Sequence, residues 1–153
     1  MAQDEMVHYE RPGWFTREVM NRAVAWLTRR GVSVWGSRVL EVTGRRSGLV
    51  RQVPVNLLAL DGAQYLVGPR GNAEWVRNVR AADGHLDLLL GRRREHRVAK
   101  ELIDAEKVEV LRAYLRRWKA EVGVFFDGVD GRSSDEDLLR IAPRHPVFRL
   151  SAR

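Results

Sequence analysis

One stretch of sequence organises the first half of the chain, residues 40–55, Leu40-Glu41-Val42-Thr43-Gly44-Arg45-Arg46-Ser47-Gly48-Leu49-Val50-Arg51-Gln52-Val53-Pro54-Val55. Two apolar runs flank a tight turn that is bracketed by Gly44 and Gly48. Glycine tolerates the positive φ of such a turn and lets another group approach the backbone closely. The stretch therefore predicts a strand, a turn rich in arginine and a second strand.

The flanking residues also predict β-structure. Residues 39–42 read as a strand that ends before Gly44, and residues 52–60 as a second strand with alternating apolar side chains. Pro54 lacks the amide that a ladder needs, so it marks an edge, a bulge or a strand start. Asp61-Gly62 is a strong hairpin signal. Further strands are expected over residues 64–67, 85–90, 95–101 and 147–150.

Helical spacing of apolar residues separates these strands. The expected helices cover residues 15–27, 73–82, 104–119 and 133–141, after a loose lead-in over residues 1–13. Asn72 is expected to cap the second helix and Asp104 the third. Ser133 with Glu136 forms a capping box for the fourth.

Together these elements predict one α+β domain over residues 1–153. Tight turns join most of the strands, so the sheet is expected to be mostly antiparallel, with five or six strands in a small barrel or roll and helices packed outside. A length of 153 residues, with 44% hydrophobic and 31% charged residues, fits a globular domain.

The composition also limits location and chemistry. No apolar run approaches the roughly 20 residues of a membrane span, and the polar start of the chain has no apolar export-signal region, so the cytoplasm is expected. The absence of cysteine excludes disulfides, thiolate metal sites and cysteine nucleophiles. The formal net charge of +7 is compatible with nucleic acid, peripheral contact with an anionic membrane, or an anionic small ligand.

The basic turn carries the strongest chemical signal. Arg45, Arg46 and Arg51 can make bidentate contacts to phosphate, and Ser47 and Thr43 add hydroxyl donors. On spacing alone, a solvated basic turn explains the pattern equally well. The chain has neither the P-loop spacing nor a Gly-x-Gly-x-x-Gly motif, which argues against a P-loop or classical Rossmann nucleotide site.

A second basic patch lies at Arg92-Arg93-Arg94, with His96 and Arg97 close behind. Nucleic-acid contact is one reading of this patch, but a solvated hairpin is the plainer one because no aromatic residue is interleaved for stacking. No nucleic-acid partner is therefore expected. None of the four histidines has zinc-ligand spacing, and the loop from Asp127 lacks the calcium-ligand pattern, so no metal site is expected.

Several motifs resemble a known family when they are taken in order over roughly residues 38–100. The resemblance rests on Thr43-Gly44-Arg45-Arg46-Ser47-Gly48 followed by Arg51, Pro54, Gly71, Trp75 and Asn78. This pattern is similar to the signature of the deazaflavin-dependent nitroreductase family. Those proteins are split-β-barrel flavin or deazaflavin oxidoreductases, related to the pyridoxamine-oxidase-like FMN-binding split barrels (β-roll type).

The resemblance implies coenzyme F420 as the cofactor, with FMN as the alternative, and a hydride transfer to an unsaturated or nitro-type small-molecule acceptor. It implies that the phosphate and acidic tail are held by Arg45, Arg46, Ser47, Gly48 and Arg51. It places Pro54 beside the ring system and closes the pocket with Arg70, Gly71, Trp75 and Asn78. No catalytic residue is assigned.

The sequence also departs from the family pattern. Residues 68–72 form a short loop where members often have a longer glycine-rich insertion, and Ala73 takes the place of a proline. None of Tyr9, Tyr65 and Tyr114 matches the substrate tyrosines of nitro-drug-activating members. A non-catalytic protein that holds a deazaflavin, a flavin or a lipid-like anion is thus the alternative function, with a basic nucleic-acid binder as a weaker one. The oligomeric state is expected to be a monomer or homodimer.

Overall fold

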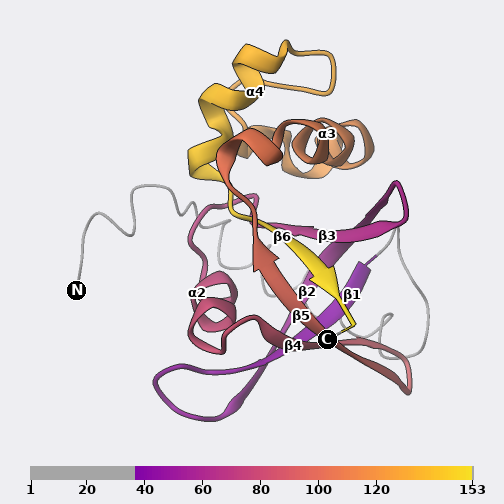
Figure 1. Ribbon diagram of the computed structural model, residues 1–153, viewed down its shortest axis with the longest axis vertical. Coiled ribbons are helices and arrows are strands. Elements are labelled where there is room, and N and C mark those ends of the chain that lie inside the picture. The colour runs from indigo at the N-terminus through magenta and orange to yellow at the C-terminus, as the bar shows by residue number, and fades with distance from the viewer. Residues whose placement is uncertain (1–36, 153) are drawn as a thin grey trace.

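The computed structural model describes residues 37–152, so the lead-in expected over residues 1–13 and the helix expected over residues 15–27 lie outside the described residues. The described chain forms a closed barrel in which neighbouring strands follow the order β1-β2-β3-β6-β5-β4 (Figure 1). β4 pairs with β1 to complete the barrel, and every strand pair is antiparallel. The predicted α+β barrel is confirmed.

The strands are β1 (Ser37–Thr43), β2 (Val50–Leu60), β3 (Ala63–Val67), β4 (His85–Leu90), β5 (Arg93–Glu101) and β6 (Val147–Ser151). The α-helices are α2 (Glu74–Ala81), α3 (Val108–Val122) and α4 (Asp135–Ile141). Single 3-10 turns cover Asp104–Glu106, Gly123–Phe125 and Ala142–Arg144. No helix within residues 37–152 is long and apolar enough to cross a membrane.

The two strands around the basic turn follow the sequence pattern closely. Pro54 lies opposite Val39 of β1, whereas the pairing of β2 with β3 begins only at Leu57. Pro54 therefore lies in a part of β2 that pairs with β1 alone, which is the edge-like position expected for a proline in a strand. Asp61 and Gly62 both adopt positive φ, 50° and 77°, which confirms the predicted hairpin turn.

Two apolar cores lie on either side of the barrel wall. The barrel core includes Leu40, Leu57, Leu66, Leu88 and Phe148 from the strands with Val76 and Val79 from α2. The helical-layer core includes Leu58 and Val147 from the strands with Leu111, Leu115, Trp118, Phe126 and Leu138. Adjacent residues Leu57 and Leu58 thus belong to different cores, as the two-residue period of a strand requires. In Figure 1, α3 and α4 form a layer above the barrel and α2 lies beside it.

Two predicted helix starts are wrong for local reasons. Ala73 occupies the N-cap of α2. The Asn72 side chain instead accepts a hydrogen bond from Arg80 Nη1 at 2.9 Å, so it braces the other end of the helix. Asp104 lies in a 3-10 turn and pairs with Lys107 Nζ at 2.9 Å, while α3 begins at Val108.

The cap of α4 is displaced by one residue. Ser134 Oγ accepts from the Asp137 amide at 3.1 Å, so Ser134 caps the helix and the predicted box of Ser133 with Glu136 is wrong. The Ser133 hydroxyl accepts from the Asp130 amide at 2.9 Å. That hydroxyl belongs to the preceding loop, which explains the shift.

Candidate functional site

The basic turn between β1 and β2 is closed by its own backbone. Gly44 N donates to Leu49 O at 2.8 Å, and Gly48 N donates to Gly44 O at 2.9 Å. Gly48 has a φ of 71°, which favours glycine, and a Cβ on Gly44 would lie 3.2 Å from Leu49 O, so the turn is tight at both glycines. Ser47 Oγ accepts from Leu49 N at 3.1 Å, which leaves the hydroxyl hydrogen for another acceptor.

Helix α2 anchors this turn from the side. Asn78 Oδ1 accepts hydrogen bonds from Arg45 N at 3.1 Å and from Arg45 Nη1 at 2.9 Å. Asn78 is buried, with 6% of its surface exposed. Trp75, one helical turn earlier, lies with its ring centroid 6.0 Å from that of Phe148 and packs against the barrel core. The helix face predicted from the three-residue spacing therefore joins the turn to the barrel.

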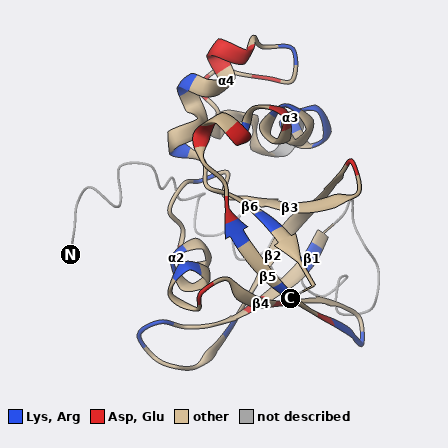
Figure 2. Ribbon diagram, in the orientation of Figure 1, with Lys and Arg blue, Asp and Glu red and all other residues tan. Residues whose placement is uncertain are grey.

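The same contacts gather positive charge at the turn. Arg45 Nη1 also donates to Glu74 Oε2 at 2.6 Å, while Arg45 Nη2 is buried without a hydrogen-bond partner. Arg46 and Arg51 are exposed, and Arg51 Cγ lies 3.4 Å from where a Cβ on Gly44 would be. Lys and Arg colour the loop beside α2 blue in Figure 2. This arrangement can bind an anion through several charged donors.

The remaining predicted residues lie outside this cluster of hydrogen bonds. Gly71 has a φ of 87°, its amide donates to Gly68 O at 3.1 Å, and its carbonyl accepts from Ala73 N at 2.8 Å. Gly71 therefore shapes the loop that leads into α2. Arg70 in that loop and Pro54 on β2 are half-buried, and within the described residues neither is hydrogen-bonded to the basic turn.

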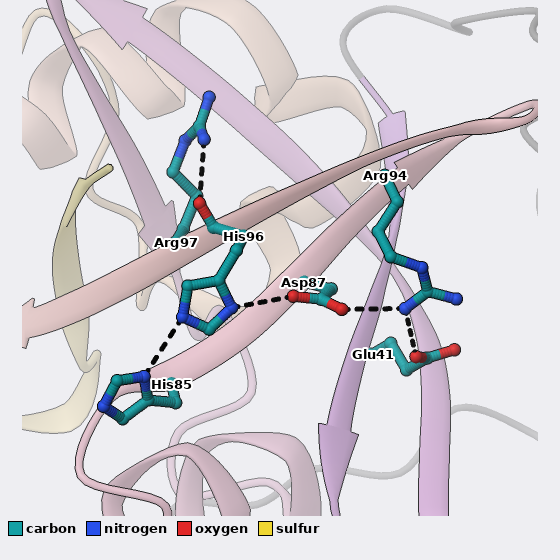
Figure 3. Close-up of polar contacts among 6 residues, drawn as sticks. All are labelled: Glu41, His85, Asp87, Arg94, His96 and Arg97. Atoms are coloured by element: carbon teal, nitrogen blue, oxygen red, sulfur yellow. Dashed lines mark hydrogen bonds and ion pairs between the residues drawn. The ribbon is translucent and has the colours of Figure 1, made fainter. Parts of the chain in front are cut away.

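A second polar cluster lies on β1, β4 and β5 (Figure 3) and joins Arg94 and His96 of the second basic patch to Glu41, Asp87 and His85, which the sequence did not indicate. Arg94 Nη1 donates to Glu41 Oε1 at 2.5 Å and to Asp87 Oδ2 at 2.7 Å. His96 Nδ1 lies 2.9 Å from Asp87 Oδ1, and His85 Nδ1 lies 3.1 Å from His96 Nε2. Because a carboxylate only accepts, His96 Nδ1 donates, and in the neutral rings His85 donates to His96.

These contacts shift both carboxylates toward the charged form. Hydrogen bonds from Arg94 and Gln52 lower the pKa of Glu41. Burial alone would raise the pKa of Asp87, but hydrogen bonds from Arg94 and His96 leave it lowered. The cluster depends on strand register, which sets Asp87 opposite both Glu41 and His96. Pairing of β1 with β4, strands distant in sequence, supplies that register.

The second basic patch is partly neutralised by neighbouring acids. Arg94 pairs with Glu41 and Asp87, and Arg97 Nη2 pairs with Glu95 Oε2 at 2.8 Å. These pairs reduce the positive potential that a phosphate backbone would require.

Within residues 37–152, no group of three or more metal-ligating side chains has a geometry that could hold a metal ion.

Comparisons with known proteins agree with the chemistry that the site geometry suggests. The family model of F420H(2)-dependent quinone reductases matches residues 14–131. The chain belongs to this family. This F420H(2)-dependent reductase is accordingly an oxidoreductase with coenzyme F420 as its cofactor. No curated protein matches the sequence.

Solved structures share the fold. A structure described as an F420-H2 dependent reductase (FDR-A) is 21% identical, with a TM-score of 0.51, and the match covers 76% of this chain and 94% of that one. A domain-swapped dimer is 23% identical over 92% of this chain and 100% of that one, with a TM-score of 0.52. A conserved hypothetical protein from Mycobacterium tuberculosis is 15% identical over 96% and 84%, with a TM-score of 0.50. The reductase retains the predicted split-barrel architecture.

Proposed function

We propose that this reductase transfers a hydride from reduced coenzyme F420 to an unsaturated organic acceptor, of which a quinone is the first choice and a nitro compound the second. The family description supports the quinone type, and the sequence motifs support the broader class. The deazaflavin supplies the hydride when bound, so the protein acts mainly by binding and orienting the two reactants.

The observation that carries the proposal is the cationic turn fixed against α2. Its residues suit a phosphate and an acidic tail, because Arg45 Nη2 is a buried donor without a partner and Arg46 and Arg51 expose charged forks. The Ser47 hydroxyl and the open surface at Gly48, where a Cβ would meet no atom within 4 Å, complete a surface that an anion can approach. Pro54, Arg70, Gly71 and Trp75 are proposed to border the ring system from the barrel and the loop before α2.

Titration with coenzyme F420, followed by its fluorescence, tests this assignment. Arg46→Ala removes one exposed charge-assisted contact, which is worth about 1.5–3 kcal/mol and therefore weakens binding roughly tenfold to a hundredfold. Arg92→Ala is the matched control, because Arg92 is equally an exposed arginine but lies in the turn between β4 and β5. Absence of F420 binding at tens of micromolar, or equal effects of the two variants, refutes the site. A purified protein that retains FMN with a flavin spectrum supports the FMN alternative.

Turnover separates the enzyme from a protein that only holds its ligand. The positions of Tyr65 and Tyr114 favour the non-catalytic ligand-binding protein, since both tyrosines lie against or within the helical-layer core and place no phenol at the turn. Oxidation of bound reduced F420 on addition of a soluble benzoquinone or a nitroaromatic supports the reductase. Tight binding without oxidation across such a panel supports the non-catalytic alternative.

We further propose a homodimer, because one protein of similar fold is a domain-swapped dimer. Light scattering at micromolar concentration is expected to give twice the chain mass of 17.6 kDa, and the chain mass itself would indicate the monomer. The cytoplasmic location expected from the sequence remains a prediction.

A further inference from the structure

Glu74 places a negative charge inside the basic site. It is the first residue of α2, and its Oε2 accepts a hydrogen bond from Arg45 Nη1 at 2.6 Å. The Glu74 side chain is 68% exposed, whereas that of Arg45 is 17% exposed. The carboxylate is therefore the solvent-facing partner of the pair, whereas the guanidinium is also held by Asn78.

Several positive charges converge on this carboxylate. The hydrogen bond from Arg45 is the main cause of the lowered pKa of Glu74, and the charges of Arg45, Arg77 and Arg46 add to it. The carboxylate also lies at the amino end of α2, where the N-cap Ala73 offers no side-chain acceptor and the helix dipole favours an anion. These charges and the dipole would favour a phosphate oxygen at the same point.

We propose that the Glu74 carboxylate occupies the anion position of the site in the cofactor-free protein and is displaced by the phosphate of the cofactor tail. This inference rests on the proposed function, since it takes the basic turn as the tail site. Two anions at one point repel each other, so the phosphate has to replace the carboxylate. Arg45 does not have to move, because Asn78 Oδ1 holds both its amide and Nη1.

Displacement would free a charged donor of Arg45 for the phosphate. Arg45 Nη1 donates both to Asn78 Oδ1 and to Glu74 Oε2. When Glu74 leaves, the Nη1 donor that it held becomes available to the phosphate, and the neighbouring Nη2 has no hydrogen-bond partner of its own. Glu74 would then act as a specificity-determining residue, because it opposes weak anions and is overcome by a multiply charged tail.

Glu74→Gln tests the inference through binding rather than turnover. Glutamine keeps the length of the side chain and removes its charge. We expect the Kd for coenzyme F420 to fall about fivefold, in line with the strength of one exposed ion pair, and the Kd for a deazaflavin truncated before the phosphate to stay unchanged. Glu136→Gln is the matched control, since Glu136 is an exposed acid in the first turn of α4 and lies in the separate helical layer.

The possible outcomes distinguish the inference from the proposed function. Suppose that the wild-type protein binds F420. If Glu74→Gln binds F420 with equal or lower affinity, or gains as much affinity for the truncated deazaflavin as for F420, Glu74 is not an anion placeholder. The proposed function survives either result. If the wild-type protein does not bind F420, the proposed function fails. In that case, titration with inorganic pyrophosphate tests the inference about Glu74 separately. Pyrophosphate should shift the NMR signal of Arg45 Nε–H at a lower concentration in Glu74→Gln than in the wild-type protein. Equal midpoints of the two titrations overturn the inference.

Discussion

Asn78→Ala should loosen the basic turn from α2 and destabilise the whole protein. The substitution removes the acceptor of two hydrogen bonds, one from the neutral amide of Arg45 and one from its charged Nη1. A neutral bond contributes about 0.5–1.5 kcal/mol and a bond to a charged group about 1.5–3 kcal/mol, so a loss of about 2–4.5 kcal/mol is expected. For a chain of this length, that loss lowers Tm by roughly 5–15 °C.

Urea unfolding followed by circular dichroism measures this loss, with Asn72→Ala as the matched control. Asn72 also accepts a bond from an arginine, Arg80 Nη1 at 2.9 Å, but in a more exposed place, so its removal should cost less than about 1 kcal/mol. The same two variants should differ in F420 affinity, because only Asn78→Ala releases Arg45. A loss of stability in Asn78→Ala no larger than in Asn72→Ala would refute the view that α2 anchors the turn.

Two other predictions concern buried positions away from the turn. His145 stacks on Phe126 with ring centroids 4.0 Å apart, and burial lowers the pKa of His145 to about 4, although the backbone of Gly68 and Pro69 opposes the shift. The pKa of this histidine in the unfolded chain is about 6.5. The contribution of neutral His145 to the free energy of unfolding should therefore be complete above pH 6.5 and fall by up to about 3 kcal/mol as the pH drops to 4. His145→Phe should remove that part of the slope in urea midpoints measured from pH 4 to 7, and an unchanged slope would contradict the assignment. Gly84→Ala should cost more than about 3 kcal/mol or prevent folding, because φ is 86° and the new Cβ would lie 2.2 Å from Ala99 O; recovery of soluble protein with an unchanged Tm would contradict it.

Local sequence was sufficient for most of the strands. Apolar alternation, the two glycines of the basic turn and Asp61-Gly62 predicted β1, β2 and β3 with boundaries within two residues. These signals act between neighbouring residues, so one sequence can carry them. Helix starts were predicted less well. Asn72 and Ser133 are residue types that often cap helices, but their side chains accept hydrogen bonds from Arg80 and from the Asp130 amide instead.

The site was only partly predictable for the same reason. The spacing of Trp75 and Asn78 predicted a shared helix face, whereas the spacing of the three arginines left an anion site and a solvated basic turn equally open. Glu74 was not among the predicted site residues, because an acid in the first turn of a helix is common and favourable for the dipole. Its contact with Arg45 joins residues 29 positions apart, and so it exists only once α2 packs beside the turn.

The sequence by itself therefore determined the strands and turns, the antiparallel α+β class and the concentration of arginine at one turn, because these properties arise from side-chain period and backbone conformation. Tertiary structure decided which charges meet. Closure of the barrel through β1 and β4 brought Glu41 to the cluster around Arg94, and the docking of α2 placed Asn78 and Glu74 beside Arg45. Both results depend on register and packing between segments distant in sequence, and it is that packing which fixes Arg45 in the turn that we propose as the anion site.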